Sequence, residues 1–149
     1  MRAIGITLIA ITIISCASSL PPAEPAPQMM DQADRVILTI DENPNIAYRN
    51  LQKHFGNKGF TVIRSNQKPL TLETKYRTFG PLMFGVWGSY SMKITASVKD
   101  SSIHFHAQLG SGTQVENSGG KNSPVKSGWN KLVEVAKEYP HQQIYYSRN

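Results

Sequence analysis

The sequence lacks the features of several common protein classes. It holds one cysteine in 149 residues, Cys16, so no intramolecular disulfide can form. Its longest apolar run, residues 3–14, has about 12 residues and is too short for a membrane-spanning helix. Ten acidic residues stand against 16 basic ones, and the acidic residues are too scattered to nominate a catalytic carboxylate pair. These absences argue against a disulfide-built scaffold, a helical membrane protein and a glycoside hydrolase.

The N-terminus has the order of features that directs export. Arg2 supplies a positive charge, residues 3–14 form the apolar run, and the small Ser15 precedes Cys16. Residues 13–16, Ile-Ile-Ser-Cys, resemble the lipobox of bacterial lipoprotein signals, with Ile where Leu is common. The resemblance implies cleavage before Cys16, a diacylglyceryl thioether on its sulfur and usually an acylated amine. Two alternatives stay open: an ordinary signal peptide cut near residues 17–19, and an uncleaved short apolar anchor.

A lipid on Cys16 predicts a membrane-attached protein, because two or three acyl chains bind a bilayer far more stably than one. The residue after the cysteine is Ala17 rather than Asp, which by the rule for enteric lipoproteins implies the outer membrane. We therefore expect a signal peptide at 1–15 and a lipidated cysteine with a proline-rich tether at 16–33. Four prolines favour a polyproline conformation for this tether, which could extend roughly 50 Å. The remaining residues, 34–149, are expected to form a single α+β domain.

Removal of residues 1–15 leaves 134 residues with 15 basic and 10 acidic side chains, a net charge of +5. The excess is spread through the chain rather than gathered in one block. Export argues against nucleic acid as the partner of this charge. Lipid headgroups, lipopolysaccharide and an acidic cell-wall polymer remain as anionic partners, beside the simpler explanation that the charge keeps the protein soluble.

Hydrophobic periodicity predicts the secondary structure of the domain. A two-residue period predicts strands at 35–40, 60–65, 70–76, 90–98 and 103–109, with a short last strand at 143–146. A first helix should follow the Asn43-Pro44 cap, with Ala47, Tyr48, Leu51 and Phe55 facing the core. Residues 110–128 should be a mobile polar loop. A second helix should follow, capped by Ser127 or Gly128, with a core stripe of Trp129, Leu132, Val133 and Ala136.

The predicted fold class is α+β, with an antiparallel sheet of four to six strands and two helices packed on one face. The order is β-α-β-β-β-β-α with a possible final strand. This order resembles the TATA-binding-protein-like or helix-grip arrangement of small envelope lipoprotein domains, including BamC-type lipoproteins. The resemblance concerns the fold alone and carries no function.

Two histidines are candidates for metal binding. His104 and His106 are two residues apart on a predicted strand, so their imidazoles should point the same way and could share Zn²⁺. A site would need a third ligand, for which His54, Glu73, Asp100 and His141 are available but not placed by the sequence. The alternative is a pair of histidines on the solvated face of a half-buried strand.

A second candidate is the apolar connection between two strands at residues 79–87. If it is exposed, it offers a contact patch for a partner or a membrane; if it folds back, it covers an open end of the core. The patch would consist of Leu82, Met83, Phe84, Val86 and Trp87.

Enzymatic signatures are incomplete. Ser118 and Ser123 each stand three residues before a lysine, the Ser-x-x-Lys spacing of penicillin-recognising enzymes, but no Lys-Thr-Gly accompanies them. We expect both in a flexible loop rather than at a helix start. Residues 119–122, Gly-Gly-Lys-Asn, lack the hydroxyl of a phosphate-binding loop, and no Gly-x-Ser-x-Gly is present. We expect no enzymatic activity and no cofactor.

Taken with the signal, these patterns predict a lipid-anchored cell-envelope protein, a non-enzymatic binding or accessory module that contacts another envelope protein or component. The alternative is a small-ligand or metal-binding lipoprotein that uses the hollow of the sheet or the pair His104 and His106. The sequence indicates no oligomeric state.

Overall fold

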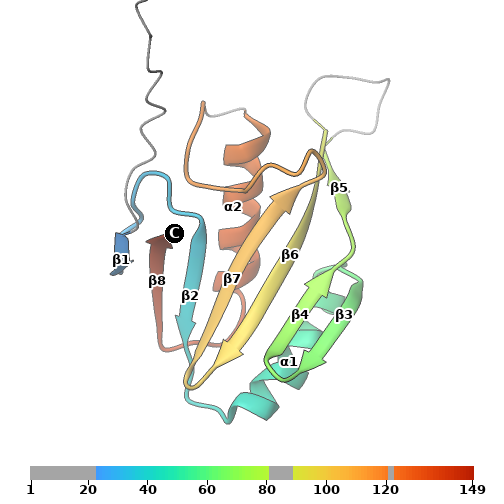
Figure 1. The fold of residues 1–149 in the computed structure, drawn as a ribbon, viewed down its shortest axis with the longest axis vertical. Helices are drawn as coiled ribbons and strands as arrows, with labels where there is room; N and C mark the ends of the chain where they lie inside the picture. The colour runs from blue at the N-terminus through green and yellow to red at the C-terminus, as the bar shows by residue number, and fades with distance from the viewer. Residues whose placement is uncertain (1–22, 81–88, 121–122) are drawn as a thin grey trace, which may run out of the picture.

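The computed structural model describes residues 23–80, 89–120 and 123–149, which form two helices and one antiparallel sheet of eight strands (Figure 1). The α+β class predicted from the sequence is confirmed. In chain order the elements are β1 (Ala23–Ala26), β2 (Arg35–Thr39), α1 (Pro44–Asn57), β3 (Val62–Gln67), β4 (Leu70–Thr74), β5 (Arg77–Phe79), β6 (Tyr90–Lys99), β7 (Ser102–Leu109), α2 (Pro124–Lys137) and β8 (Gln143–Arg148).

The sheet runs β1-β8-β2-β7-β6-β4-β3, so that β1 and β3 are its two edges, and β5 also pairs with β6. The central hairpin β6–β7 has the clean two-residue alternation that the sequence predicted. The inward side chains Met92, Ile94, Ile103 and Phe105 are fully buried, whereas the residues between them are half-buried on the open face. Burial of one face only is typical of antiparallel sheets that are covered on a single side.

Both helices lie behind the same face of the sheet in Figure 1. Helix α2 packs on β7, β2 and β6, and α1 packs on β4, β6 and β3. Trp129 and Leu132 of α2 and Leu51 and Phe55 of α1 are fully buried. Burial of such large apolar side chains contributes on the order of 2 kcal/mol each, so these four residues stabilise the packing of both helices on the sheet.

The start of α1 agrees with the prediction. The Asn43 side chain accepts a hydrogen bond from the Asn45 backbone N–H at 2.9 Å, and Pro44 fills the first helical position. Tyr48 and Ala47 are buried together with the rest of the predicted stripe.

The predicted start of the second helix is wrong. The cap is Ser123, whose hydroxyl accepts from the Lys126 backbone N–H at 3.1 Å, rather than Ser127 or Gly128. Gly128 lies inside the helix, where an added Cβ would stand 3.1 Å from a methyl group of Val115. The preceding loop is also less polar than expected, because Val115 is fully buried beneath α2.

The strand count exceeds the four to six that were predicted. The two additional strands are β1 and β5, which are four and three residues long. Both are too short to show a period in the sequence. Strand β1 contains Pro25, which an edge strand tolerates because the missing N–H faces away from the ladder. Tyr76, predicted to share the buried face of β4, is 41% exposed because β4 ends at Thr74.

Part of the range predicted as tether belongs to the folded domain. Strand β1 pairs with β8, and Ala33 is fully buried. The buried Asn117 fixes the segment between them: its amide donates to the Met30 carbonyl at 2.7 Å, and its backbone carbonyl accepts from Gln32 N–H at 3.0 Å. Composition alone predicted an extended tether here, but pairing with β8 and Asn117 supplies the missing hydrogen-bond partners.

Candidate functional site

Cys16 lies outside the described residues, as do Leu82, Met83, Phe84, Val86 and Trp87. Strands β5 and β6, which flank that patch in sequence, pair with each other antiparallel. No helix among the described residues is long and apolar enough to cross a membrane.

His104 and His106 both lie on the open face of β7, half-buried, as their spacing predicted. The Ser102 hydroxyl is 3.0 Å from His104 Nε2. Burial, followed by the charge of Arg35, lowers the pKa of both imidazoles. Within residues 23–80, 89–120 and 123–149, no three His, Cys, Asp or Glu side chains group closely enough to hold a metal ion. The two histidines therefore lie side by side as predicted, but the described residues supply no third ligand for a metal site.

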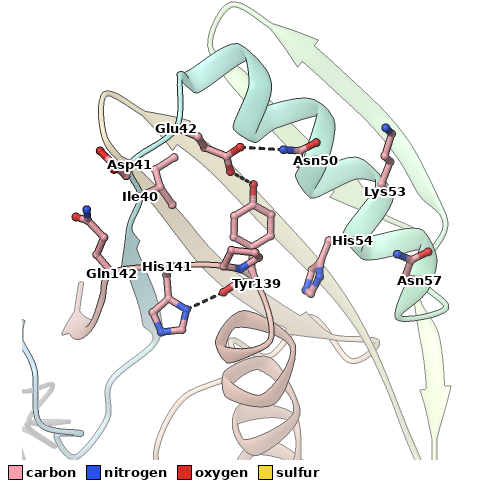
Figure 2. Close-up of a pocket in the computed structure, with 11 residues that line it drawn as sticks. Ile40, Asp41, Glu42, Asn50, Lys53, His54, Asn57, Tyr139, His141 and Gln142 are labelled. Atoms are coloured by element: carbon pink, nitrogen blue, oxygen red, sulfur yellow. Dashed lines mark hydrogen bonds between the residues drawn. The ribbon is translucent and has the colours of Figure 1, made fainter.

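A well-defined hollow lies away from these histidines, beside α1. It is a cleft of about 620 Å³ between α1, the loop that enters α1 and the loop that joins α2 to β8 (Figure 2). The lining residues are Ile40, Asp41, Glu42, Asn50, Lys53, His54, Asn57, Tyr139, Pro140, His141 and Gln142.

Glu42 is the central carboxylate of this cleft. One of its oxygens accepts a hydrogen bond from the Asn50 amide at 2.8 Å, and the other accepts from the Tyr139 hydroxyl, as the dashed lines in Figure 2 show. Tyr139 is 2% exposed, and its hydroxyl also lies 3.2 Å from the Ala47 carbonyl. Burial, then the hydrogen bond to Glu42, raises the pKa of Tyr139 far above its usual value. The phenol therefore stays a neutral donor that fixes the carboxylate in place.

Two imidazoles flank Tyr139. His54 Nε2 lies 2.8 Å from the Val135 carbonyl, and His141 Nδ1 lies 2.7 Å from the Tyr139 carbonyl. A carbonyl only accepts, so each of these nitrogens carries the proton. When a ring is uncharged, its second nitrogen is an acceptor, and for both rings this nitrogen hydrogen-bonds no described residue. The His54 ring also packs edge-on against Tyr139, at 5.4 Å between centroids.

The centre of the cleft is consequently rich in hydrogen-bond acceptors that internal bonds hold still. Glu42, His54 and His141 all offer lone pairs, and Asp41 adds an exposed carboxylate at the rim. Such an arrangement suits a group that donates several hydrogen bonds, such as an ammonium or guanidinium. Among the eleven lining residues there is no Ser, Thr or Cys to act as a nucleophile.

This cleft was not among the sites predicted from the sequence. His54 and His141 were candidates only as additional metal ligands, and Glu42 and Tyr139 were not candidates. The available signal was positional: Asp41-Glu42 directly precedes the cap of α1, and Tyr139-Pro140-His141 directly follows α2. Ends of helices that pack side by side bring such residues together, but the sequence does not show that the helices are neighbours.

The Ser-x-x-Lys pattern at Ser123 lies at a helix start, not in a flexible loop as expected. Its parts are nevertheless engaged in structural contacts. The Ser123 hydroxyl caps α2, and the Lys126 ammonium hydrogen-bonds the Asn117 side-chain oxygen. The serine and the lysine ammonium share no hydrogen bond. The geometry thus does not activate Ser123.

Comparison with known proteins adds no relative: no family model matches the chain, and no curated protein matches its sequence.

Proposed function

We propose that this chain is a lipid-anchored cell-envelope protein whose domain is a non-enzymatic binding module. The cleft between α1 and the α2–β8 loop is its binding site, and the bound partner or ligand presents an ammonium or guanidinium group. The observation that carries the proposal is the fixed set of acceptors at Glu42, His54 and His141.

The anchor rests on the N-terminal sequence. Residues 13–16 have the lipobox pattern, and Cys16 is the sole cysteine, so lipidation gives it a role that disulfide formation cannot. Two acyl chains on one sulfur-linked glycerol hold a protein on a bilayer stably. The outer membrane is the proposed location because residue 17 is Ala.

The binding role rests on the cleft. Internal hydrogen bonds already hold its polar groups in one arrangement, so little conformational entropy is lost when a ligand binds. We place ligand binding in the cleft rather than on the sheet face, because the described residues supply no third ligand beside His104 and His106. Binding of an envelope protein through a basic side chain and binding of a small amine are two forms of the same chemistry.

The anchor is tested by mass spectrometry and fractionation of the full-length protein expressed in a Gram-negative host. We expect the wild-type chain to begin at Cys16, to carry acyl chains and to sediment with membranes. The Cys16→Ser variant should be unacylated and leave the membrane fraction. An unmodified Cys16, or a mature chain that begins after it, would contradict the anchor and leave the cleft untouched.

The cleft is tested by titrating the full-length chain, held in a nonionic detergent, with agmatine, which carries one amine and one guanidinium. We expect the ring resonances of His54 and His141 to shift with saturation. Glu42→Gln keeps an oxygen for Tyr139 but removes the charge, and should weaken binding about tenfold. Asp31→Asn removes one exposed carboxylate outside the cleft and should leave the affinity for agmatine unchanged. Equal affinity in all three proteins would rule out the cleft as the site.

A further inference from the structure

The excess of positive charge, which was predicted to be spread through the chain, lies in one stretch that the fold places at one edge. Residues 44–80 hold seven basic side chains and one acidic side chain, a net charge of +6. All other residues from 16 onward hold eight basic and nine acidic side chains, a net charge of −1. Residues 44–80 comprise α1, β3, β4 and β5, which lie together on one side of the molecule in Figure 1. The whole excess therefore belongs to this side, which we call the basic edge.

Three of the seven cations have structural contacts. Lys58 pairs with Glu138, and Arg64 shares the carboxylate of Glu73. Arg77 stacks over the rings of Phe60 and Phe79, at 5.4 and 5.0 Å from their centroids. These contacts give the three cations a structural role that needs no external partner.

The other four cations lack such contacts. They are exposed and form no ion pair with any described residue. Arg49 and Lys53 lie one turn apart on α1, so their side chains leave the same face of the helix. They are joined on the basic edge by Lys68, in the β3–β4 turn, and by Lys75, which follows β4.

A polar groove of about 500 Å³ runs beside Arg49, between α1 and the β3–β4 hairpin. Its walls carry amides, a hydroxyl and a phenol, groups that both donate and accept hydrogen bonds. The lining residues are Asn45, Tyr48, Arg49, Gln52, Ser65, Gln67 and Leu70. Amides and a cation in one groove match a chain of sugars that carries hydroxyls and carboxylates.

Protection of an edge strand explains only part of the charge. Strand β3 is exposed, and its register shifts between Val62 and Arg64, a bulge that discourages pairing with another sheet. Charges at Arg64 and Lys68 serve the same purpose. Arg49 and Lys53 are on a helix, where no strand edge needs protection.

The basic edge also lies far from the N-terminal edge. Strand β1 forms the opposite side of the sheet, and six intervals of about 4.8 Å put the two edges roughly 29 Å apart. The chain enters the domain at β1. A partner bound at β3 and α1 therefore lies on the side of the domain opposite to β1. This position favours binding of a polymer in the space around the domain over binding of the headgroups of the bilayer that holds the anchor.

We propose that the basic edge binds an anionic polysaccharide, with carboxylates at Arg49 and Lys68 and sugar hydroxyls in the adjacent groove. The choice of a glycan over nucleic acid rests on the export proposed above. The groove beside Arg49 shares no lining residue with the Glu42 cleft; of the four cations, only Lys53 lines that cleft instead.

The test uses the full-length chain in a nonionic detergent and oligomers of polygalacturonate as the probe, with binding measured by calorimetry at several salt concentrations. Uncharged dextran oligomers, polyglutamate, duplex DNA and phosphatidylglycerol vesicles are the comparison ligands. The variant Arg49→Gln/Lys68→Gln removes two charges from the basic edge. The control Lys99→Gln/Lys137→Gln removes two exposed charges outside it, so both proteins have the same net charge.

We expect polygalacturonate to bind most tightly, to weaken as salt rises, and to lose about tenfold in affinity with the edge variant but less than about threefold with the control. Equal losses in the two variants would mean that net charge alone matters, and would overturn the proposal. Tighter binding of polyglutamate, DNA or vesicles would overturn it in favour of that partner. Mass spectrometry of Cys16 separately decides the anchor, so failure of one proposal is not failure of the other.

Discussion

The hydroxyl of Tyr139 hydrogen-bonds the carboxylate of Glu42, and this contact joins residues that are 97 positions apart in the chain. It ties the loop after α2 to the loop before α1 and forms the back wall of the cleft. Because the phenol is 2% exposed, its loss cannot be compensated by water. Tyr139→Phe should lower the free energy of unfolding by about 1–3 kcal/mol, measured by urea denaturation.

The matched control for this prediction is Tyr145→Phe. The Tyr145 hydroxyl donates to the Gln143 side chain in an exposed position, where water can replace the lost partner. Its removal should change stability by less than about 0.5 kcal/mol. Equal effects of the two substitutions would show that the hydroxyl of Tyr139 does not hold the loops together.

Asn117 should anchor the segment that leads into β2. Its side chain is 8% exposed and bonds both the Met30 carbonyl and the Lys126 ammonium. Asn117→Ala leaves the Met30 carbonyl without its donor, and should destabilise the domain by about 1–3 kcal/mol. Amide hydrogen exchange should accelerate at Gln32, whose N–H donates to the Asn117 carbonyl. The exposed Asn130→Ala in α2 should do neither, and unchanged exchange at Gln32 in the Asn117 variant would contradict the role.

Much of the core was predictable because periodicity is a local property. The alternation from Met92 to Val98 predicts which side of the strand faces the core, independently of the strands that pair with it. The Asn43-Pro44 cap was read correctly for the same reason. Ser123-Pro124 carries the same signal, but the surrounding Gly, Ser and Asn residues predicted a loop. Val115 in that stretch is fully buried, but its burial could not be predicted because a single apolar residue has no period.

The cleft was not predictable, because it depends on which elements are neighbours. The charge of the basic edge is already concentrated in residues 44–80 of the sequence, but its gathering into one surface also depends on which elements are neighbours. Nothing in the sequence connects Glu42 with Tyr139, and their hydrogen bond follows from the packing of two helices on one sheet. The same holds for Arg49 and Lys68, which are isolated cations along the chain. The pairing of β3 with β4 and the packing of α1 on them gather their charges at one edge.

Thr74 should be a structural threonine whose hydroxyl cannot be replaced by a methyl group. It is fully buried at the end of β4, and its oxygen accepts from the Ile94 backbone N–H at 2.9 Å. The β4–β6 ladder ends one residue earlier, at Glu73 and Thr95. Thr74→Val therefore leaves a buried N–H unpaired and should cost about 1–2 kcal/mol in urea unfolding. Thr71→Val, on the half-buried open face, should change stability by less than about 0.5 kcal/mol.

His106 should make the domain less stable in acid. It lies half-buried on the open face of β7, where burial and then the charge of Arg35 lower its pKa; Lys93 acts in the same direction, while Asp34 and Glu73 oppose it. A lowered pKa in the folded state means that the unfolded chain binds the proton first as the pH falls. The stabilising effect of neutral His106 is therefore complete above its unfolded pKa and is lost as the pH falls through the folded pKa.

His106→Gln removes this titration while keeping a polar side chain of similar length. Between pH 7.5 and pH 5 the wild-type chain should lose more unfolding free energy than the variant, measured by urea denaturation at matched ionic strength. His104 has a lowered pKa from the same causes, led by burial, so the double variant His104→Gln/His106→Gln should have a flatter pH dependence than either single variant. If the double variant instead keeps the wild-type slope, the acid sensitivity of the domain does not come from this face of the sheet.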